Sequence, residues 1–117
     1  MSEPSSCLFC RIVREEIPAT VVLKQDRVTA FRDIAPRAPT HILIVPDEHI
    51  PGAAEVKARD EAIVGRLVRM AAEIARREGI GDSGYRLIIN QGPDASQSVD
   101  HLHVHLIGGR KLLVNMV

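Results

Sequence analysis

Five segments of the chain carry the pattern of apolar and β-branched residues that is typical of strands. They span residues 20–24, 28–33, 41–46, 85–90 and 101–107. Only Gln25-Asp26-Arg27 separates the first two segments, which predicts a hairpin. The third segment is an almost unbroken apolar run, and this predicts a strand buried on both faces.

Two other segments show helical periodicity. A short one, 7–14, is expected to end at the Ile17-Pro18 pair, because proline interrupts a helix. A long one, 59–78, is followed by Gly79 and Gly81, which are typical stop signals. Four apolar residues lie on one face of the long segment at steps of four, three and four: Ile63, Leu67, Met70 and Ile74.

The order of these elements predicts an α+β domain. Five strands with one long helix after the third favour an antiparallel sheet covered by that helix. The Pro-containing segment 35–39 and the polar segment 91–99 are expected to be loops. We expect residues 1–117 to form a single domain, with 1–6 as a flexible N-terminus and 111–117 as a C-terminal tail.

Charge and hydropathy exclude several classes of partner. Lys plus Arg number 15 and Asp plus Glu number 15, so the chain lacks the basic excess with which proteins bind nucleic acid. No apolar run approaches the roughly 18 residues of a transmembrane helix. Residues 1–6 are polar and do not form a signal peptide. We therefore expect a cytoplasmic protein that binds neither nucleic acid nor membrane.

The most distinctive feature is the run His101-Leu102-His103-Val104-His105-Leu106, in which histidine alternates strictly with aliphatic residues. Side chains alternate between the two faces of a strand, so the three imidazoles should share one face and the aliphatic residues the other. Three adjacent imidazoles are costly to bury without partners, so this face should line a cleft or a metal site. Two interpretations follow from the residues alone: a zinc site, or a histidine nucleophile with histidine helpers.

The segment from Gln97 to Ile107 resembles the signature of the histidine triad family, whose pattern is three histidines separated by single hydrophobic residues after Gln-Ser-Val. Three further segments resemble that family in the expected order, and the resemblance covers residues 7–110. They are Phe31-Arg32-Asp33-Ile34-Ala35-Pro36, Pro39-Thr40-His41-Ile42-Leu43-Ile44-Val45-Pro46 and Glu48-His49-Ile50. Gly108-Gly109-Arg110 is similar to the Hint-like branch, the nucleoside phosphoramidate hydrolases.

The resemblance implies roles for individual residues. His103 matches the nucleophile, His105 its phosphate-binding neighbour and His41 an active-site histidine on another strand; the hydroxyl of Ser98 can donate to the leaving nitrogen. Asp33 matches the acidic residue that binds the ribose hydroxyls, and Ile34 the apolar residue beside the base. The groups around the phosphate match Asn90, Ser96, Gln97 and Ser98. Turn caps, strand ends and plain loop residues are the structural alternatives for these polar positions.

Cys7-Leu8-Phe9-Cys10 is a C-x-x-C motif with three interpretations. Thioredoxin-like redox chemistry lacks its expected βαβ context here, and an inert pair on a helix is the structural alternative. A metal site needs two more ligands, and His49 and His101 are available. The resemblance favours this set, because several bacterial-type members of the family place zinc on matching positions. A closed Cys₂His₂ set suggests a structural ion. Catalysis is expected to need no metal, because His105 and the Ser/Gln loop can hold the phosphate charge by hydrogen bonds.

The expected function is hydrolysis of purine nucleoside phosphoramidates through a nucleotidyl-histidine. Alternatives are dinucleoside polyphosphate hydrolysis, a nucleotide-binding regulatory module with incidental turnover, and a metalloenzyme. The family also implies a homodimer with a continuous sheet. Two departures concern the active site: Ala95-Ser96 stands where the family loop has Gly-Gly, and the tail 111–117 lacks the Trp-Pro-Pro-Gly end. If a glycine there supplies a positive φ, Ala or Ser fits less comfortably.

Overall fold

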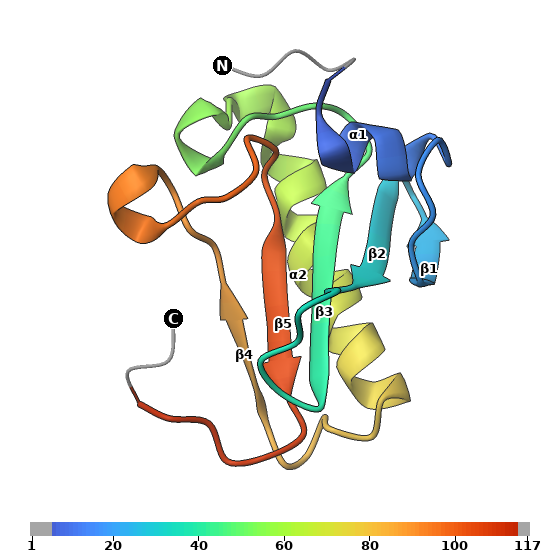
Figure 1. Ribbon diagram of the computed structural model, residues 1–117, viewed down its shortest axis with the longest axis vertical. Coiled ribbons are helices and arrows are strands. Elements are labelled where there is room, and N and C mark those ends of the chain that lie inside the picture. The colour runs from blue at the N-terminus through green and yellow to red at the C-terminus, as the bar shows by residue number, and fades with distance from the viewer. Residues whose placement is uncertain (1–5, 115–117) are drawn as a thin grey trace.

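A computed structural model describes residues 6–114, in which five strands form one antiparallel sheet (Figure 1). The strands lie in the order β1-β2-β3-β5-β4. Their bounds are Val21–Gln25 for β1, Val28–Arg32 for β2, Thr40–Pro46 for β3, Tyr85–Ile88 for β4 and Val104–Gly108 for β5. The expected α+β class and its five-stranded antiparallel sheet are confirmed. Residues 1–5 and 115–117, most of the expected flexible N-terminus and the end of the tail, lie outside the described residues.

Two helices pack on opposite faces of the sheet, and three short 3-10 turns accompany them. The helices are α1, Leu8–Val13, and α2, Glu61–Arg77, and Figure 1 shows α2 crossing behind β3 and β5. The 3-10 turns, which the periodicity does not indicate, span Ala53–Glu55, Ala58–Asp60 and Pro93–Ala95. None of the helices within residues 6–114 has the length and apolar character needed to cross a membrane.

Strand β3 separates two cores. Ile42 and Ile44 belong to the larger core, where they pack with the apolar face of α2, and both side chains have no exposed surface. Leu43 and Val45 point to the other face and pack with α1 in a smaller core. The expectation of a strand buried on both faces is therefore confirmed. Of the four apolar residues expected on the face of α2, Leu67, Met70 and Ile74 are buried and Ile63 is partly buried against the same core.

The two helices end by different means. In α2, the N–H of Gly79 bonds to the carbonyl of Arg76 and the N–H of Ile80 to that of Ala75, with Gly79 at φ 76°. This is the Schellman arrangement, and it confirms Gly79 as the stop signal. Helix α1 ends at Val13, before the Ile17-Pro18 pair that the sequence suggested. Glu15 adopts φ 63° there and its N–H bonds to the Ile12 carbonyl, so the chain turns away before the proline is reached.

Strand β5 begins at Val104, three residues later than the expected start at His101. The main chain of the preceding segment bonds elsewhere: the N–H of Leu102 donates to the carbonyl of Ile50, and the N–H of His101 to that of Val99. The alternation of side chains nevertheless continues through this segment, since Leu102, Val104 and Leu106 all belong to the α2 core. The histidines thus lie on the opposite face, but His101 and His103 precede the strand.

Candidate active site and metal cluster

A cleft of about 590 Å³ lies on the histidine face, between the segment after β2 and the loop before β5. Six of the residues expected to act on a nucleotide line it: Asp33, His41, Asn90, Ser96, Ser98 and His105. They come from four separate parts of the chain, and only the sheet brings them together. The alternation in β3 and β5 places His41 and His105 on the floor of the cleft, since both point away from the α2 core.

Hydrogen bonds fix the protonation of His41 and His105. The main-chain N–H of Arg37 donates to His41 Nδ1 at 3.1 Å, so this nitrogen carries a lone pair and the proton of the neutral ring sits on Nε2. His41 Nε2 lies 3.0 Å from His105 Nδ1 and 3.5 Å from a carboxylate oxygen of Asp33. His41 therefore donates to His105, whose own proton is left on Nε2. His105 becomes a hydrogen-bond donor on the floor of the cleft.

His103 has the opposite arrangement. Its Nδ1 lies 2.7 Å from the carbonyl oxygen of His101, and because a carbonyl can only accept, His103 carries its proton on Nδ1. Its Nε2 then holds a free lone pair. The ring packs at an edge-to-face angle against Phe9, with centroids 5.1 Å apart, and lies 5.0 Å from the ring of His105. His103 is 4% exposed, so it is held in one orientation beside the cleft.

All three rings are kept neutral near pH 7. Burial lowers the pKa of His105 to about 4, with further lowering by His103 and His41. Burial also lowers the pKa of His103 and that of His41, although the charge of Asp33 acts in the other direction on both. A neutral imidazole offers a lone pair or an N–H at a defined position, which is what nucleophilic attack and anion binding require.

Three of the residues expected to act on a nucleotide are absent from the cleft lining: Ile34, Gln97 and His103, the last of which lies directly beside His105. Ile34 is 99% exposed. The amide of Gln97 instead braces the loop before β5: its oxygen accepts from the N–H of Gly92 at 2.9 Å, and its nitrogen donates to the Pro51 carbonyl at 2.9 Å. Ser96 adopts the left-handed conformation, with φ 60° and ψ 39°. The position where the family has glycine therefore does use a positive φ.

Several residues of the cleft were not expected from the sequence, namely Arg37, Asp94, Ile88 and Ile107. Ile107 could have been found, because it lies two residues after His105 and so shares its face of β5. Arg37 and Asp94 lie in irregular segments without periodicity, and only the tertiary structure brings them to the cleft.

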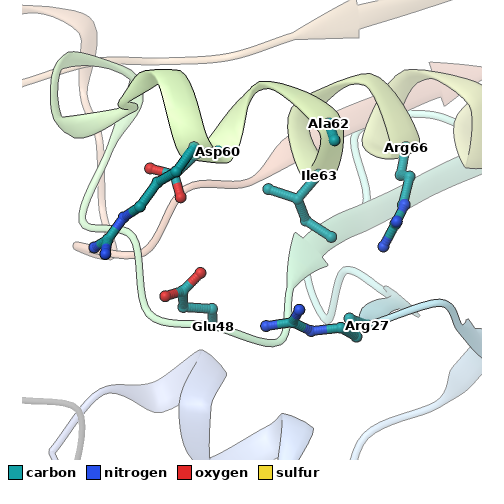
Figure 2. A pocket seen from close by; sticks show the side chains of 7 residues that line it. Arg27, Glu48, Asp60, Ala62, Ile63 and Arg66 are labelled. Carbon is teal, nitrogen blue, oxygen red and sulfur yellow. The ribbon is translucent and has the colours of Figure 1, made fainter.

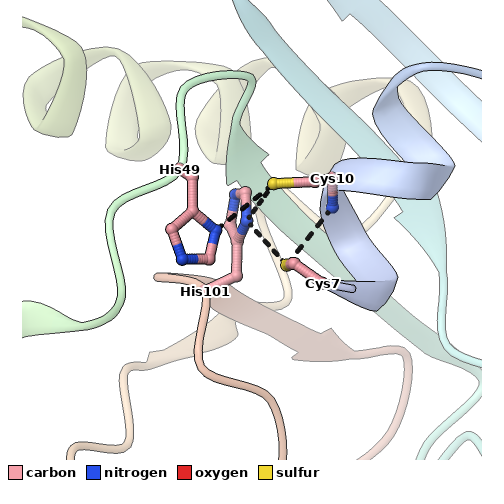
Figure 3. Close-up of side chains that lie close together, drawn as sticks. All are labelled: Cys7, Cys10, His49 and His101. Carbon is pink, nitrogen blue, oxygen red and sulfur yellow. Dashed lines mark hydrogen bonds between the residues drawn. The ribbon is translucent and has the colours of Figure 1, made fainter. Parts of the chain in front are cut away.

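A second group of side chains joins α1 to the segments that follow β3 and precede β5. Cys7, Cys10, His49 and His101 offer ligand atoms that all lie within 4.8 Å of one another (Figure 3). His101 Nδ1 is 3.3 Å from Cys7 Sγ and 3.5 Å from Cys10 Sγ, and His49 Nδ1 is 3.3 Å from Cys10 Sγ. In a tetrahedral zinc site, sulfur and nitrogen ligands are separated by about 3.5 Å. The spacing therefore fits zinc.

The chemistry of these donors also fits a metal ion. His101 Nε2 donates to the Pro46 carbonyl at 2.8 Å, so its Nδ1 lone pair faces the sulfur atoms. Burial lowers the pKa of His101 to about 4, which keeps the ring neutral. Burial and the neighbouring Cys7 raise the pKa of the Cys10 thiol to about 11. A buried cation would remove that obstacle, because it stabilises the thiolate directly.

Asp33, His41 and His105 also bring three potential ligand atoms within 4.8 Å. Their hydrogen bonds oppose metal binding, however. A neutral His41 could bind an ion through Nε2 only with its proton on Nδ1, where the N–H of Arg37 already donates. Both groups contain residue types that bind metals. The Cys/His cluster has hydrogen bonds compatible with a bound ion, whereas the Asp/His group does not.

A smaller pocket of about 110 Å³ lies between the first turns of α2 and the segment after β3 (Figure 2). Three arginines and two carboxylates line it: Arg27, Arg59, Arg66, Glu48 and Asp60. Because this pocket contains both positive and negative side chains, it lacks the electrostatic potential of a single sign that would select an ionic ligand. The histidine cleft is the better candidate site.

The chain matches the HIT domain over residues 14–112. It is 51% identical to the purine nucleoside phosphoramidase of Escherichia coli (strain K12) over 105 residues, which cover 90% of this chain and 88% of that protein. It is 47% identical to the 14 kDa zinc-binding protein of Zea mays over 112 residues, covering 94% of this chain and 87% of that one. The crystal structure of a HIT family hydrolase from Legionella pneumophila Philadelphia 1 superposes with a TM-score of 0.92 at 43% identity, over 94% of this chain and 98% of the other. The chain belongs to the HIT domain family, within its Hint-like branch.

Proposed function

We propose that the protein hydrolyses purine nucleoside phosphoramidates and releases the nucleoside monophosphate. The observation that carries this proposal is the pair of opposite tautomers at the cleft. His103 holds a lone pair on Nε2, and His105 beside it holds a proton on Nε2. One ring is thus equipped to attack phosphorus and the other to bind a phosphate oxygen. The similarity to the purine nucleoside phosphoramidase of Escherichia coli supports the choice of substrate class.

The reaction proceeds in two displacements. His103 Nε2 attacks the α-phosphorus, a new N–P bond forms, and the bond from phosphorus to the leaving nitrogen breaks with its electron pair on that nitrogen. The leaving amine takes a proton. The Nε2–H of neutral His105 is hydrogen-bonded to the phosphate, so the hydroxyl of Ser98, which lines the cleft, relays this proton from solvent water to the leaving nitrogen. Water then attacks the phosphorus of the nucleotidyl-imidazole, the N–P bond breaks with its electron pair on His103 Nε2, and the proton that the water loses returns to solvent.

The nucleotide is held by groups around the same cleft. Asp33 accepts hydrogen bonds from the ribose hydroxyls, and Asn90, Ser96 and Ser98 surround the phosphate together with His105. Gln97 acts through the loop that it braces. Ile34 is exposed on the segment that contains Asp33, where it can cover the base of a bound purine.

Cys7, Cys10, His49 and His101 are proposed to hold one zinc ion. When bound, the ion supplies structural cross-linking and no Lewis acid to the reaction, since its four protein ligands close the coordination sphere. Catalysis has no metal requirement, because hydrogen bonds from His105 and the loop before β5 carry the phosphate charge.

The assembly is proposed to be a two-fold homodimer that extends the sheet. Strand β4 lies at the edge of the five-stranded sheet, and its residues are only partly buried. A strand of a second copy could pair along the outer side of β4, which has no neighbouring strand among the described residues. Sedimentation should show a dimer at micromolar concentration, and a monomer there would contradict this proposal.

The function is tested by mixing the protein with adenosine 5′-phosphoramidate and quenching rapidly in alkali, in which nucleotidyl-histidine survives. Mass spectrometry should find one adenylyl group, located on His103, and AMP should accumulate in the unquenched reaction. Faster turnover of a dinucleoside polyphosphate would favour that alternative substrate. Tight AMP binding without any adduct or turnover would favour a regulatory binding module.

A further inference from the structure

The groups that line the histidine cleft include two carboxylates, whose charge opposes the binding of a phosphate. Asp33 and Asp94 carry negative charges, and the two histidines of the lining are neutral near pH 7. Two carboxylates facing an anionic substrate would repel it over the few ångströms of the cleft. Among the described residues that line the cleft, only Arg37 bears a permanent positive charge.

The main chain holds Arg37 directly beside the catalytic histidines. Its N–H donates to His41 Nδ1 at 3.1 Å, and its carbonyl oxygen accepts from the guanidinium of Arg110 at 2.9 Å. Arg37 is itself exposed, so replacing its side chain does not open a packed core. Burial is the main cause of the lowered pKa of His41 and of His105, and the Arg37 charge adds to both effects, as expected for a guanidinium close to the two rings.

Two other arginines, Arg110 and Arg32, are absent from the cleft lining. The guanidinium of Arg110 donates to the carbonyl oxygens of Arg37 and Lys111. Arg32 forms a two-pronged ion pair with Glu78, at 3.0 and 3.1 Å. Neither is placed to neutralise a ligand in the cleft.

We propose that Arg37 binds the phosphoryl group of the substrate, as a further catalytic residue of the reaction proposed above. Its guanidinium offsets the charge of Asp33 and Asp94 and complements the neutral hydrogen bond from His105 Nε2. The proposal rests on the proposed function for its kinetic consequence. It also makes a statement about binding that holds for any phosphate-bearing nucleotide.

The test compares Arg37→Gln and Arg37→Lys with Arg59→Gln, which removes the same charge from a residue that does not line the histidine cleft. Arg37 is exposed, and its main-chain hydrogen bonds to His41 and Arg110 do not depend on the side chain, so the substitutions should leave the fold intact. With adenosine 5′-phosphoramidate, Arg37→Gln should lower kcat/KM by about 10- to 100-fold, the range for a lost charged hydrogen bond. Arg37→Lys should recover part of this loss, and Arg59→Gln should stay within about twofold of the parent.

Calorimetry with AMP and with adenosine supplies a readout that does not depend on turnover. Arg37→Gln should weaken AMP binding about tenfold and leave adenosine binding unchanged, because only AMP carries the phosphate. Equal AMP affinity in Arg37→Gln and the parent would overturn the proposal, as would equal weakening of both ligands. If the parent turns over no phosphoramidate and Arg37→Gln still discriminates in this way, the proposed function fails and the role of Arg37 in phosphate binding stands.

Discussion

The carbonyl oxygen of His101 accepts a hydrogen bond from His103 Nδ1 at 2.7 Å. This contact joins the two sites of the protein, because His101 is a member of the Cys/His cluster and His103 lies beside the cleft. It also fixes the lone pair of His103 on Nε2. Phe9 adds a second connection, since it lies between Cys7 and Cys10 in α1 and packs against the ring of His103. The cluster thus positions the proposed nucleophile from two sides.

The roles of His103 and His105 can be separated by mutation. His103→Ala removes the bond-forming atom and should lower kcat by several orders of magnitude, with AMP affinity nearly unchanged. His105→Ala removes one hydrogen-bond donor and should lower kcat by about 10²–10³. Steady-state rates and AMP titrations of both variants check this. Activity of His103→Ala within tenfold of the parent would show that another group attacks the phosphorus.

Removal of metal should affect stability before it affects chemistry. We expect one zinc per chain in untreated protein. Chelation, or Cys10→Ser, should lower the free energy of unfolding by several kcal/mol, because a buried site would lose its cation. Leu8→Ser is a matched control, since Leu8 lies on the same helix with 45% of its surface exposed, and it should change stability by about 0.5 kcal/mol or less. Elemental analysis without zinc, or a Cys7–Cys10 disulfide, would refute the site.

The left-handed conformation of Ser96 predicts a stabilising substitution. A residue with a Cβ atom pays about 1 kcal/mol at such a φ, which glycine does not. Ser96→Gly should therefore raise the free energy of unfolding by up to about 1 kcal/mol, reduced by the greater freedom of glycine in the unfolded chain. Ala95→Gly is the control: Ala95 has no positive φ, so this change should destabilise the protein. Urea unfolding of both variants distinguishes these outcomes.

Local periodicity explains how much of the fold could be predicted. The steps of four, three and four from Ile63 to Ile74 define the apolar face of α2. Gly79 ends that helix by adopting a positive φ, a conformation that glycine reaches whatever its neighbours are. Strand order is different in kind. Strand β5 inserts between β3 and β4 because of contacts made across the whole chain, and no local pattern encodes that choice.

The residues of the candidate site could be predicted from the sequence, whereas most of its geometry could not. The alternation from His101 to His105 correctly places the imidazoles on the face away from α2. The late start of β5 was not predictable, because the N–H of Leu102 finds its partner at Ile50, far away in the sequence. The tautomers also depend on distant main-chain groups, as with the N–H of Arg37 at His41. Residue types indicated the proposed chemistry, and the tertiary structure sets which nitrogen of each ring carries the proton.

The burial of His105 predicts a dependence of stability on pH. Its pKa is lowered to about 4, whereas an unfolded histidine titrates near 6.5. Between these values the unfolded chain takes up a proton that folded His105 does not, so the free energy of unfolding should fall as the pH drops from about 6.5 to about 4. Urea unfolding of zinc-loaded protein should show this slope, and His105→Gln should reduce it, leaving the smaller contributions of His41 and His103. An imidazolium signal of His105 in NMR spectra at pH 6 would contradict the prediction.

The hydrogen bond from His41 to His105 predicts that replacing His41 changes the tautomer of His105. His41 Nε2 donates to His105 Nδ1 at 3.0 Å and so holds the His105 proton on Nε2, toward the substrate. In His41→Phe the ring shape remains but the donor is lost, and His105 becomes free to carry its proton on Nδ1. We expect kcat to fall by about 10²–10³, comparable to the loss of the His105 donor itself. His41→Gln places an amide N–H near the position of Nε2 and should retain more activity than His41→Phe. Nitrogen NMR of His105 gives a readout beyond turnover: the parent should show the Nε2–H form, His41→Phe a mixture, and His41→Gln mainly Nε2–H. Equal activity of the two variants, with an unchanged His105 tautomer, would show that His41 acts by packing alone.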